Sequence, residues 1–270
     1  MLTRNPKSGL ESSVVKEMDR LGVQSVIVLG SSAAIRDSIA KSLGAKYGDA
    51  KVERIGGASR YDTATLIADR LAQEVGKADT FFLTTGTNFP DALAASPIAA
   101  MNNWPILFTD PKSQHLQPST AQWLAKGSIE PGGVVYPLGS PSVVPDVTAG
   151  DAKTATGAAD SHRLAGGTRY ETAIAINTYP SFTGLFTRSS TDPGSAVAIT
   201  TGKNFPDAVA GGVFAARIQA PLFLVDGTAT ASSATTTTVR NAVLAWPHVA
   251  TYVFGGTPAV TDLALRLHIT

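Results

Sequence analysis

The chain repeats itself, and this repetition constrains its fold more than any single motif does. Residues 54–64 read RIGGASRYDTA, and residues 163–173, 109 positions further along, read RLAGGTRYETA. Residues 84–95 (TTGTNFPDALAA) return 116 positions later as residues 200–211 (TTGKNFPDAVAG). A repeat of this size indicates an architecture of similar units, so it has to be recognised before any motif is interpreted.

The spacing of the repeats divides the chain into three parts. Later segments keep the spacing of 116, so we place an insertion of about seven residues at 187–194 (TRSSTDPG). A shortened copy comes first, because residues 26–37 (VIVLGSSAAIRD) match the region around Gly139, and residues 2–8 resemble residues 107–113. We therefore predict a truncated first repeat at 1–50 and two complete repeats at 51–159 and 160–270.

Each complete repeat alternates short apolar runs with Ala-rich segments at helical spacing. Residues 80–85, 105–109 and 133–138 are typical of buried strands, whereas residues 61–75 and 90–103 are typical of helices. Strands that alternate with helices favour right-handed crossovers and a mainly parallel sheet. The predicted fold class is α/β, with one small three-layer, Rossmann-like or Toprim-like unit per repeat.

The starts of the two helices carry recognisable signals. Asp62 or Thr63 is expected to cap the first helix, just after its Arg-Tyr pair. Pro90 suits the first position of the second helix, with Asn88 as its predicted cap and Asp91 in the first turn. A structural role at the helix starts could therefore explain these residues whatever the function of the chain.

Composition excludes several classes of function. The 270 residues include no cysteine, which removes disulfides, thiolate zinc sites and cysteine nucleophiles. The formal net charge of +1 gives no overall field that would attract nucleic acid or an anionic membrane. No apolar run is long enough to enter a membrane, and the first residues lack a signal peptide's apolar region.

No catalytic sequence pattern recurs in both complete repeats. The four histidines have no counterparts in the other complete repeat, and neither HExxH, GxSxG, GxGxxG nor a Walker pattern occurs. We therefore predict no catalytic residue, no metal site and no cofactor. The turns GSSAAI and GGTPAV could hold an anion on free backbone N–H groups, although a plain tight turn is the simpler interpretation.

The most specific polar pattern is a pair of arginines beside a Gly-Gly turn, followed by tyrosine. Arg54 and Arg60 form this pair in one repeat, and Arg163 and Arg169 form it in the next. Such arginines could grip a phosphate or carboxylate through forked hydrogen bonds, with the tyrosine as a stacking face. In a purely structural interpretation they join the repeats through ion pairs with Asp91, Asp207 or other acids, and both interpretations remain open.

Taken together, RxxGxxRYxTA, TTGxNFPDALAA, the PILFTD strand and the LGSPSVV turn resemble the cell wall binding repeat 2 family of Gram-positive bacteria. The resemblance covers nearly the whole chain as about two and a half repeats. It implies non-covalent attachment of exported proteins to anionic secondary wall polymers, by repeats that commonly pack around a pseudo-threefold axis. The family motif lands on the predicted ligand-binding residues Arg54, Arg60, Tyr61, Thr63, Asn88, Asp91, Arg163, Arg169, Tyr170, Thr172, Asn204 and Asp207.

The leading functional hypothesis is a non-catalytic wall-binding module that holds an anionic, teichoic-acid-like glycan through repeated weak sites. We expect it at the cell surface, with a signal peptide on a longer precursor, and with other repeats or chains completing a threefold arrangement. We expect neither nucleic acid as a partner nor insertion into a membrane. Two alternatives stay open: part of a peptidoglycan hydrolase of the amidase type or its modifier, and a protein–protein module of a surface layer.

Overall fold

The computed structural model describes residues 1–3, 9–187, 189–192 and 194–269. These form two compact units, residues 1–70 and residues 71–270. The predicted likeness of residues 2–8 to residues 107–113 falls mostly outside the described residues, as do two positions of the predicted insertion. The repeat boundaries at 1–50, 51–159 and 160–270 stay a prediction.

The first unit is a small parallel βα arrangement. Its elements are α1 (Ser12–Arg20), β1 (Val26–Leu29), α2 (Asp37–Tyr47), the short 3-10 helix η1 (Asp49–Lys51), β2 (Val52–Ile55) and the first part of α3 (Arg60–Val75). Strand β1 pairs in parallel with β2. Met18, Val28, Ile39 and Leu43 form its apolar core. This unit contains the first Arg-Tyr segment.

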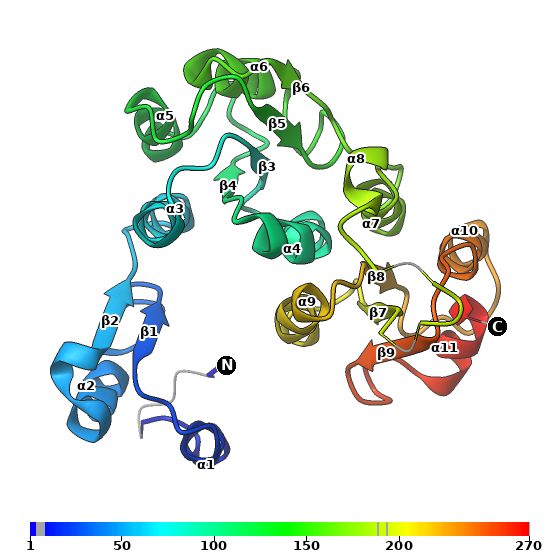
Figure 1. The fold of residues 1–270 in the computed structure, drawn as a ribbon, viewed down its shortest axis with the longest axis horizontal. Coiled ribbons are helices and arrows are strands. Elements are labelled where there is room, and N and C mark those ends of the chain that lie inside the picture. The colour runs from blue at the N-terminus through cyan, green and yellow to red at the C-terminus, as the bar shows by residue number, and fades with distance from the viewer. Residues whose placement is uncertain (4–8, 188, 193, 270) are drawn as a thin grey trace. The chain divides into compact units, whose positions relative to one another are not determined.

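The second unit begins with a four-stranded parallel sheet in the order β4-β3-β5-β6. Its elements are β3 (Phe81–Thr85), α4 (Pro90–Asn102), β4 (Ile106–Thr109), α5 (Pro118–Ala125), β5 (Val134–Pro137), α6 (Asp146–Thr156) and β6 (Asp160–Ser161). Helix α4 packs on β3 and β4, α5 on β4, and α6 on β5 (Figure 1). The central strand β3 is buried along its whole length, as an apolar run between covering helices should be.

A second parallel sheet, in the order β8-β7-β9, repeats this pattern. The chain runs through α7 (Arg169–Asn177), α8 (Pro180–Thr183), β7 (Ala196–Thr201), α9 (Pro206–Arg217), β8 (Leu222–Val225), α10 (Ala234–Leu244), β9 (Ala250–Phe254) and α11 (Asp262–Ile269). Even the register returns, because Phe82 pairs with Ile106 and the residues 116 positions later, Ala198 and Leu222, also pair.

The two sheets share one core because the chain crosses between them at β6. Strand β6 pairs with β5 of the first sheet. The helix that follows it, α7, instead packs on β8 of the second sheet and against α4. Phe82, Ile98, Ile176 and Phe223 are fully buried in the resulting cluster. This crossover brings the Arg-Tyr segment of one repeat to the NFPD segment of the repeat before it.

The predicted strands and helices are confirmed, but two predicted caps are wrong. Helix α3 begins at Arg60, so Ser59 stands before it and exchanges hydrogen bonds with Asp62, with 2.8 Å from the Ser59 nitrogen to Oδ2. Helix α4 does begin at Pro90, yet its N-cap position is Phe89, and no side chain caps the helix by a hydrogen bond. The Asn88 oxygen is already used, because it accepts a hydrogen bond from the neighbouring Phe89 nitrogen at 3.0 Å.

None of the helices in the described part of the chain combines the length and apolar character that a membrane crossing requires.

Candidate functional site

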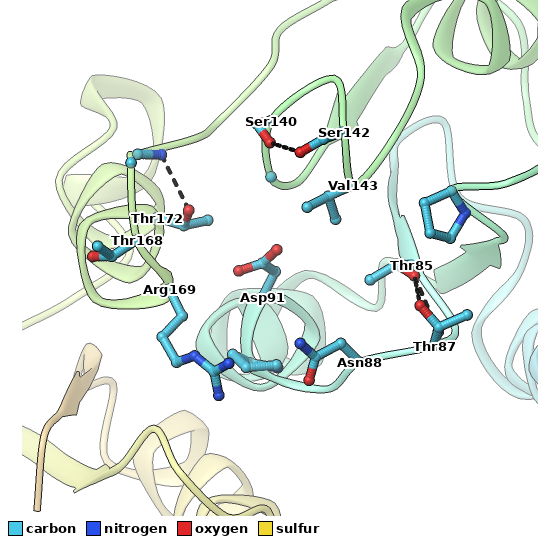
Figure 2. A pocket seen from close by; sticks show the side chains of 15 residues that line it. Thr85, Thr87, Asn88, Asp91, Ser140, Ser142, Val143, Thr168, Arg169 and Thr172 are labelled. Atoms are coloured by element: carbon cyan, nitrogen blue, oxygen red, sulfur yellow. Dashed lines mark hydrogen bonds between the residues drawn. The ribbon is translucent and has the colours of Figure 1, made fainter.

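A polar cavity of about 320 Å³ lies where two copies of the repeat meet in the second unit. It lies beyond the carboxyl ends of β3 and β5, which is the edge where parallel α/β sheets bind ligands. Figure 2 shows side chains from the start of α4, the start of α7 and the loop after β5 around one space. The lining residues are Thr85, Thr87, Asn88, Pro90, Asp91, Pro111, Gly139, Ser140, Ser142, Val143, Gly166, Gly167, Thr168, Arg169 and Thr172.

Asp91, in the first turn of α4, is the acid of this cavity. Burial raises the pKa of its carboxyl from 3.8 to about 6, although the positive charge of Arg169 acts in the opposite direction. Among the described residues, no donor forms a hydrogen bond with this carboxylate. A half-buried carboxylate without donors gains from a ligand that supplies them.

The wall opposite Asp91 has to be glycine. Gly139 has φ +95°, and a Cβ atom there would lie 2.7 Å from the Asp91 Oδ2 atom. The same arrangement returns in the next repeat, where Gly255 has φ +118° and its Cβ would lie 2.9 Å from Asp207 Oδ2. The turn after the strand therefore approaches the aspartate closely only because it lacks a side chain.

Arg169 is the positively charged residue of the cavity and the first residue of α7. Its Nη1 donates a hydrogen bond to the carbonyl of Gly202 at 2.6 Å, and its guanidinium carbon lies 6.0 Å from the centre of the Phe89 ring. The ring of Phe89 in turn meets the ring of Phe205, its counterpart in the next repeat, with 5.8 Å between centres. The guanidinium is thus held between the two repeats.

The start of α7 is fixed by its own sequence. Thr168 and Glu171 form a capping box, in which each side chain accepts a hydrogen bond from the other's backbone nitrogen. The Thr172 hydroxyl accepts a hydrogen bond from the Gly166 nitrogen at 3.1 Å, as Thr63 does from the Gly57 nitrogen at 3.0 Å. Thr63 and Thr172 therefore hold the Gly-Gly turn in place.

Arg54 and Arg163 are built into the protein in matching ways. Arg163 Nη1 donates to the Gly139 carbonyl at 2.7 Å, and its Nη2 contacts Asp146 at 2.7 Å. In the first unit, Arg54 donates to the Gly30 carbonyl at 2.7 Å, and its salt bridge to Asp37 measures 3.3 Å. Each arginine fastens the glycine turn that follows a strand. Their predicted contact with a ligand stays a prediction.

The other predicted residues lie at several places. Asn88, Asp91, Arg169 and Thr172 line the cavity together, whereas Arg163 reaches it through the Gly139 carbonyl. Tyr170 packs against the apolar core, and its burial raises the pKa of its phenol. Arg60, Tyr61 and Thr63 belong to α3, and Asn204 and Asp207 stand at the start of α9.

Hydroxyl groups are the part of the site that the residue pattern missed. The Ser140 and Ser142 hydroxyls lie 2.7 Å apart, and those of Thr85 and Thr87 lie 2.8 Å apart. Thr168 contributes a fifth hydroxyl group to the lining of the cavity. The position of these residues in the sequence could have indicated them, because the TTGTNFPD and PLGSPS segments follow predicted strands.

The family described as cell wall binding domain 2 matches residues 54–149 and residues 163–264, more than half of the chain. The chain belongs to this family. Both matched ranges begin at the arginines that hold the glycine turns. The resemblance inferred from the sequence is thereby confirmed, and the chain is a cell wall binding module.

Two relatives from Bacillus subtilis (strain 168) are similar to this chain. N-acetylmuramoyl-L-alanine amidase LytC is 29% identical over 231 residues, which cover 84% of this chain and 40% of the amidase. A protein named amidase enhancer is 29% identical over 101 residues, which cover 37% of this chain and 13% of that protein. The chain therefore spans less than half the length of either relative.

Two solved structures share the fold. Cwp6 from Clostridium difficile matches with a TM-score of 0.77 and 20% identity over 98% of this chain and 39% of that one. Cwp8 from the same species matches with a TM-score of 0.70 and 20% identity over 96% of this chain and 40% of that one. They confirm the predicted α/β repeat fold. The family match places the chain among cell wall or surface proteins.

Proposed function

We propose that this chain attaches an exported protein to the cell wall without catalysis, by binding an anionic secondary wall polymer such as a teichoic-acid-like glycan. The observation that carries the proposal is the composite cavity, in which the NFPD segment of one repeat faces the Arg-Tyr segment of the next. Its polar groups are suited to binding a ligand, and no catalytic sequence pattern recurs in the two complete repeats.

The cavity offers complementary groups to a charged sugar. Asp91 presents carboxylate oxygens that accept hydrogen bonds from sugar hydroxyls, and the serine and threonine hydroxyls both donate and accept. Arg169 supplies positive charge for a phosphate or carboxylate on the polymer. About 320 Å³ is at the small end of ligand sites, so it fits one unit of a polymer rather than a long segment.

Repetition suits such a ligand. A polymer that presents the same group many times can engage several weak sites at once, and linked sites raise the overall affinity through effective concentration. The matching residues Asn204 and Asp207 in the next repeat, and Arg60, Tyr61 and Thr63 in α3, are the candidates for further sites. A threefold arrangement completed by other repeats or chains belongs to the same proposal.

The amidase named among the relatives raises an enzymatic alternative. The chain matches 40% of that amidase, and we propose that the shared part is the wall-binding part. Purified chain incubated with isolated walls is expected to release no soluble sugar or peptide. Release above the level of a heat-inactivated sample would contradict a purely binding role.

Replacing Arg169 tests the proposed site. Arg169→Ala removes the guanidinium, so we expect at least tenfold weaker retention on isolated walls, about 1.4 kcal/mol of binding free energy. Arg169→Lys keeps the charge but loses the forked geometry, and is expected to fall between Ala and the parent chain. Co-sedimentation with walls over a concentration series measures both.

Two controls separate binding from folding. Arg217→Ala removes an exposed arginine at the end of α9, away from the cavity, and is expected to leave retention unchanged. Chemical unfolding of each variant reports any loss from the Arg169 bond to Gly202. If a folded Arg169→Ala chain binds walls as the parent does, and salt does not weaken that binding, the anionic-polymer proposal fails.

A further inference from the structure

A second cavity, of about 510 Å³, lies at the opposite edge of the first sheet from the cavity of Asp91 and Arg169. Its walls are the segment that leads into β3, the segment between α4 and β4, and the segment that leads into β5. None of the predicted ligand-binding residues lines it. The polar and aromatic residues of this cavity, called the Trp104 cavity below, are Lys77, Asp79, Asn102, Asn103, Trp104 and Glu130.

The next repeat fills the same place with apolar side chains. The position that matches Trp104 is Ala220, which is fully buried. The position that matches Glu130 is Trp246, which is 3% exposed and packs its ring against Phe223. The Trp104 cavity is therefore not part of the repeated pattern, and the packing of a repeat does not require it.

Trp104 presents a half-buried aromatic ring in a fixed orientation. Its indole stacks on Tyr136 with 6.1 Å between ring centres, and the rings of Phe82 and Phe182 each lie 5.9 Å away. The Trp104 nitrogen also donates a hydrogen bond to the Ala99 carbonyl at 2.9 Å. Because the protein already holds this ring in place, a ligand that packs on it loses little binding energy to ordering.

The polar groups beside the ring are mainly hydrogen-bond acceptors. The carboxylates of Asp79 and Glu130 have neither a hydrogen-bond donor nor an ion-pair partner among the described residues. The Asn102 side chain donates its Nδ2 to the Ile98 carbonyl at 2.8 Å, so its oxygen faces outward demand as an acceptor. Such a set of groups suits a ligand that is rich in hydroxyl donors.

Hydrogen bonds fasten together the two segments that carry the carboxylates. The Glu130 nitrogen donates to the Ala78 carbonyl at 2.9 Å. Lys77 Nζ donates to the Gly127 carbonyl at 2.8 Å. Lys77 is the cavity's one cationic side chain among the described residues, against two carboxylates. The excess of negative charge disfavours a phosphate and favours an uncharged ligand.

We propose that the Trp104 cavity binds an uncharged pyranose ring of a glycan. The apolar face of such a sugar packs on the Trp104 indole, and its hydroxyls donate to the carboxylates of Asp79 and Glu130. A volume of about 510 Å³ lies within the range of sites for small ligands. The inference goes beyond the proposed function, because it concerns other residues and a ligand without charge.

The fluorescence of Trp104 tests the proposal directly. The chain has three tryptophans, and Trp123 and Trp246 are 5% and 3% exposed, so acrylamide should quench mainly Trp104. Chitotetraose or cellotetraose at millimolar concentration is expected to protect it in a saturable way, whereas inorganic phosphate is not. If neither sugar protects at tens of millimolar, or phosphate protects as well as they do, the proposal is overturned.

The two sugars also distinguish the source of the ring. Chitotetraose carries N-acetyl groups, as the glycan strands of peptidoglycan do, whereas cellotetraose offers hydroxyls alone, as unacetylated sugars of a secondary polymer do. Stronger protection by one of them assigns the site to that kind of sugar.

Substitutions test the named groups. The double variant Asp79→Ala, Glu130→Ala keeps the fluorescent ring and changes two exposed side chains, and it is expected to need at least tenfold more sugar for half-maximal protection. Asp262→Ala, at an exposed acid at the start of α11 that lines neither cavity, is the matched control and should behave as the parent. Trp104→Phe keeps an aromatic ring in the core but a smaller platform, and titration calorimetry should show several-fold weaker binding.

Urea unfolding of each variant identifies any loss of folding. A folded double variant that binds sugar as tightly as the parent would contradict the proposal. Arg169→Ala leaves the Trp104 cavity intact, so it should still bind the sugar while it is retained less well on walls. If sugar binding fails but retention that depends on Arg169 persists, this inference alone is refuted.

Discussion

Helices α4 and α9 show how two similar segments acquire different energetics in two places. Both begin at the proline of an Asn-Phe-Pro-Asp segment, and both pack on the strands of their own sheet. Helix α4 is in addition enclosed by α7 and α9, whereas α9 leaves Val209, Val213 and Phe214 exposed. The difference teaches that one sequence pattern can serve as core in one repeat and as surface in another, depending on which neighbour it meets.

The largest expected effect comes from truncating the matching residues Ile98 and Phe214. Ile98→Ala opens a cavity in the shared core, so we expect the free energy of unfolding to fall by about 2–5 kcal/mol. Phe214→Ala removes a ring that is more than a third exposed and touches Tyr252 and Phe254, so we expect about 1 kcal/mol. Urea unfolding at low protein concentration measures both. Equal losses would show that Phe214 is covered in solution as fully as Ile98 is.

A smaller effect concerns the pH dependence of stability. The folded chain keeps the Asp91 proton up to about pH 6, whereas the unfolded chain releases it near the ordinary value of 3.8. Between these values the folded state binds more protons, so the ionisation of Asp91 lowers the free energy of unfolding as pH rises. That cost is absent below about pH 4 and complete above about pH 6, at up to about 3 kcal/mol.

Asp91→Asn removes this titration. The variant is therefore expected to gain stability relative to the parent as pH rises from about 4 to about 6, and to show a constant difference above that range. Urea unfolding of the two chains across this range measures the difference. A difference that does not change with pH would contradict the raised pKa of Asp91.

The smallest expected effect tests how closely α4 and α9 cross. A Cβ atom on Gly212 of α9 would lie 2.2 Å from the Ser96 hydroxyl of α4, its own counterpart in the repeat. Gly150, within α6, has no atom within 4 Å of such a Cβ. We expect Gly150→Ala to stabilise the chain by about 0.5–1 kcal/mol through helix propensity, and Gly212→Ala to stabilise it less.

Thermal unfolding of the two glycine variants measures this difference. Ser96→Ala removes the hydroxyl in question, so the double variant with Gly212→Ala should recover part of the missing gain. If Gly212→Ala stabilises as much as Gly150→Ala, the two helices do not cross closely at this point.

Local signals in the sequence predicted much of the fold. Pro90 marks the start of α4 and Asp91 lies in its first turn, because the fixed φ of proline and the helix dipole act on adjacent residues. The cap predicted at Asn88 was wrong because its oxygen bonds to the next backbone nitrogen instead. A choice between two equally local hydrogen bonds cannot be read from residue type.

The candidate site was predicted in its parts and not in its assembly. The sequence singled out Asp91 and Arg169, and it left open whether the arginines face acids of the protein or a ligand. The structure brings these two together because β6 joins the first sheet while α7 packs on the second. Ser140 and Ser142 were not among the predicted ligand-binding residues, since serine after a strand is common in turns.

The sequence by itself determined that the chain is a repeated α/β protein of the cell wall binding domain 2 family, because periodicity and motif order are properties of neighbouring residues. Only the tertiary structure decided that the NFPD segment of one repeat meets the Arg-Tyr segment of the next. It also decided that α4 is buried while α9 is exposed. Those outcomes depend on contacts between residues far apart in the chain, and similar segments receive different contacts when their neighbours differ.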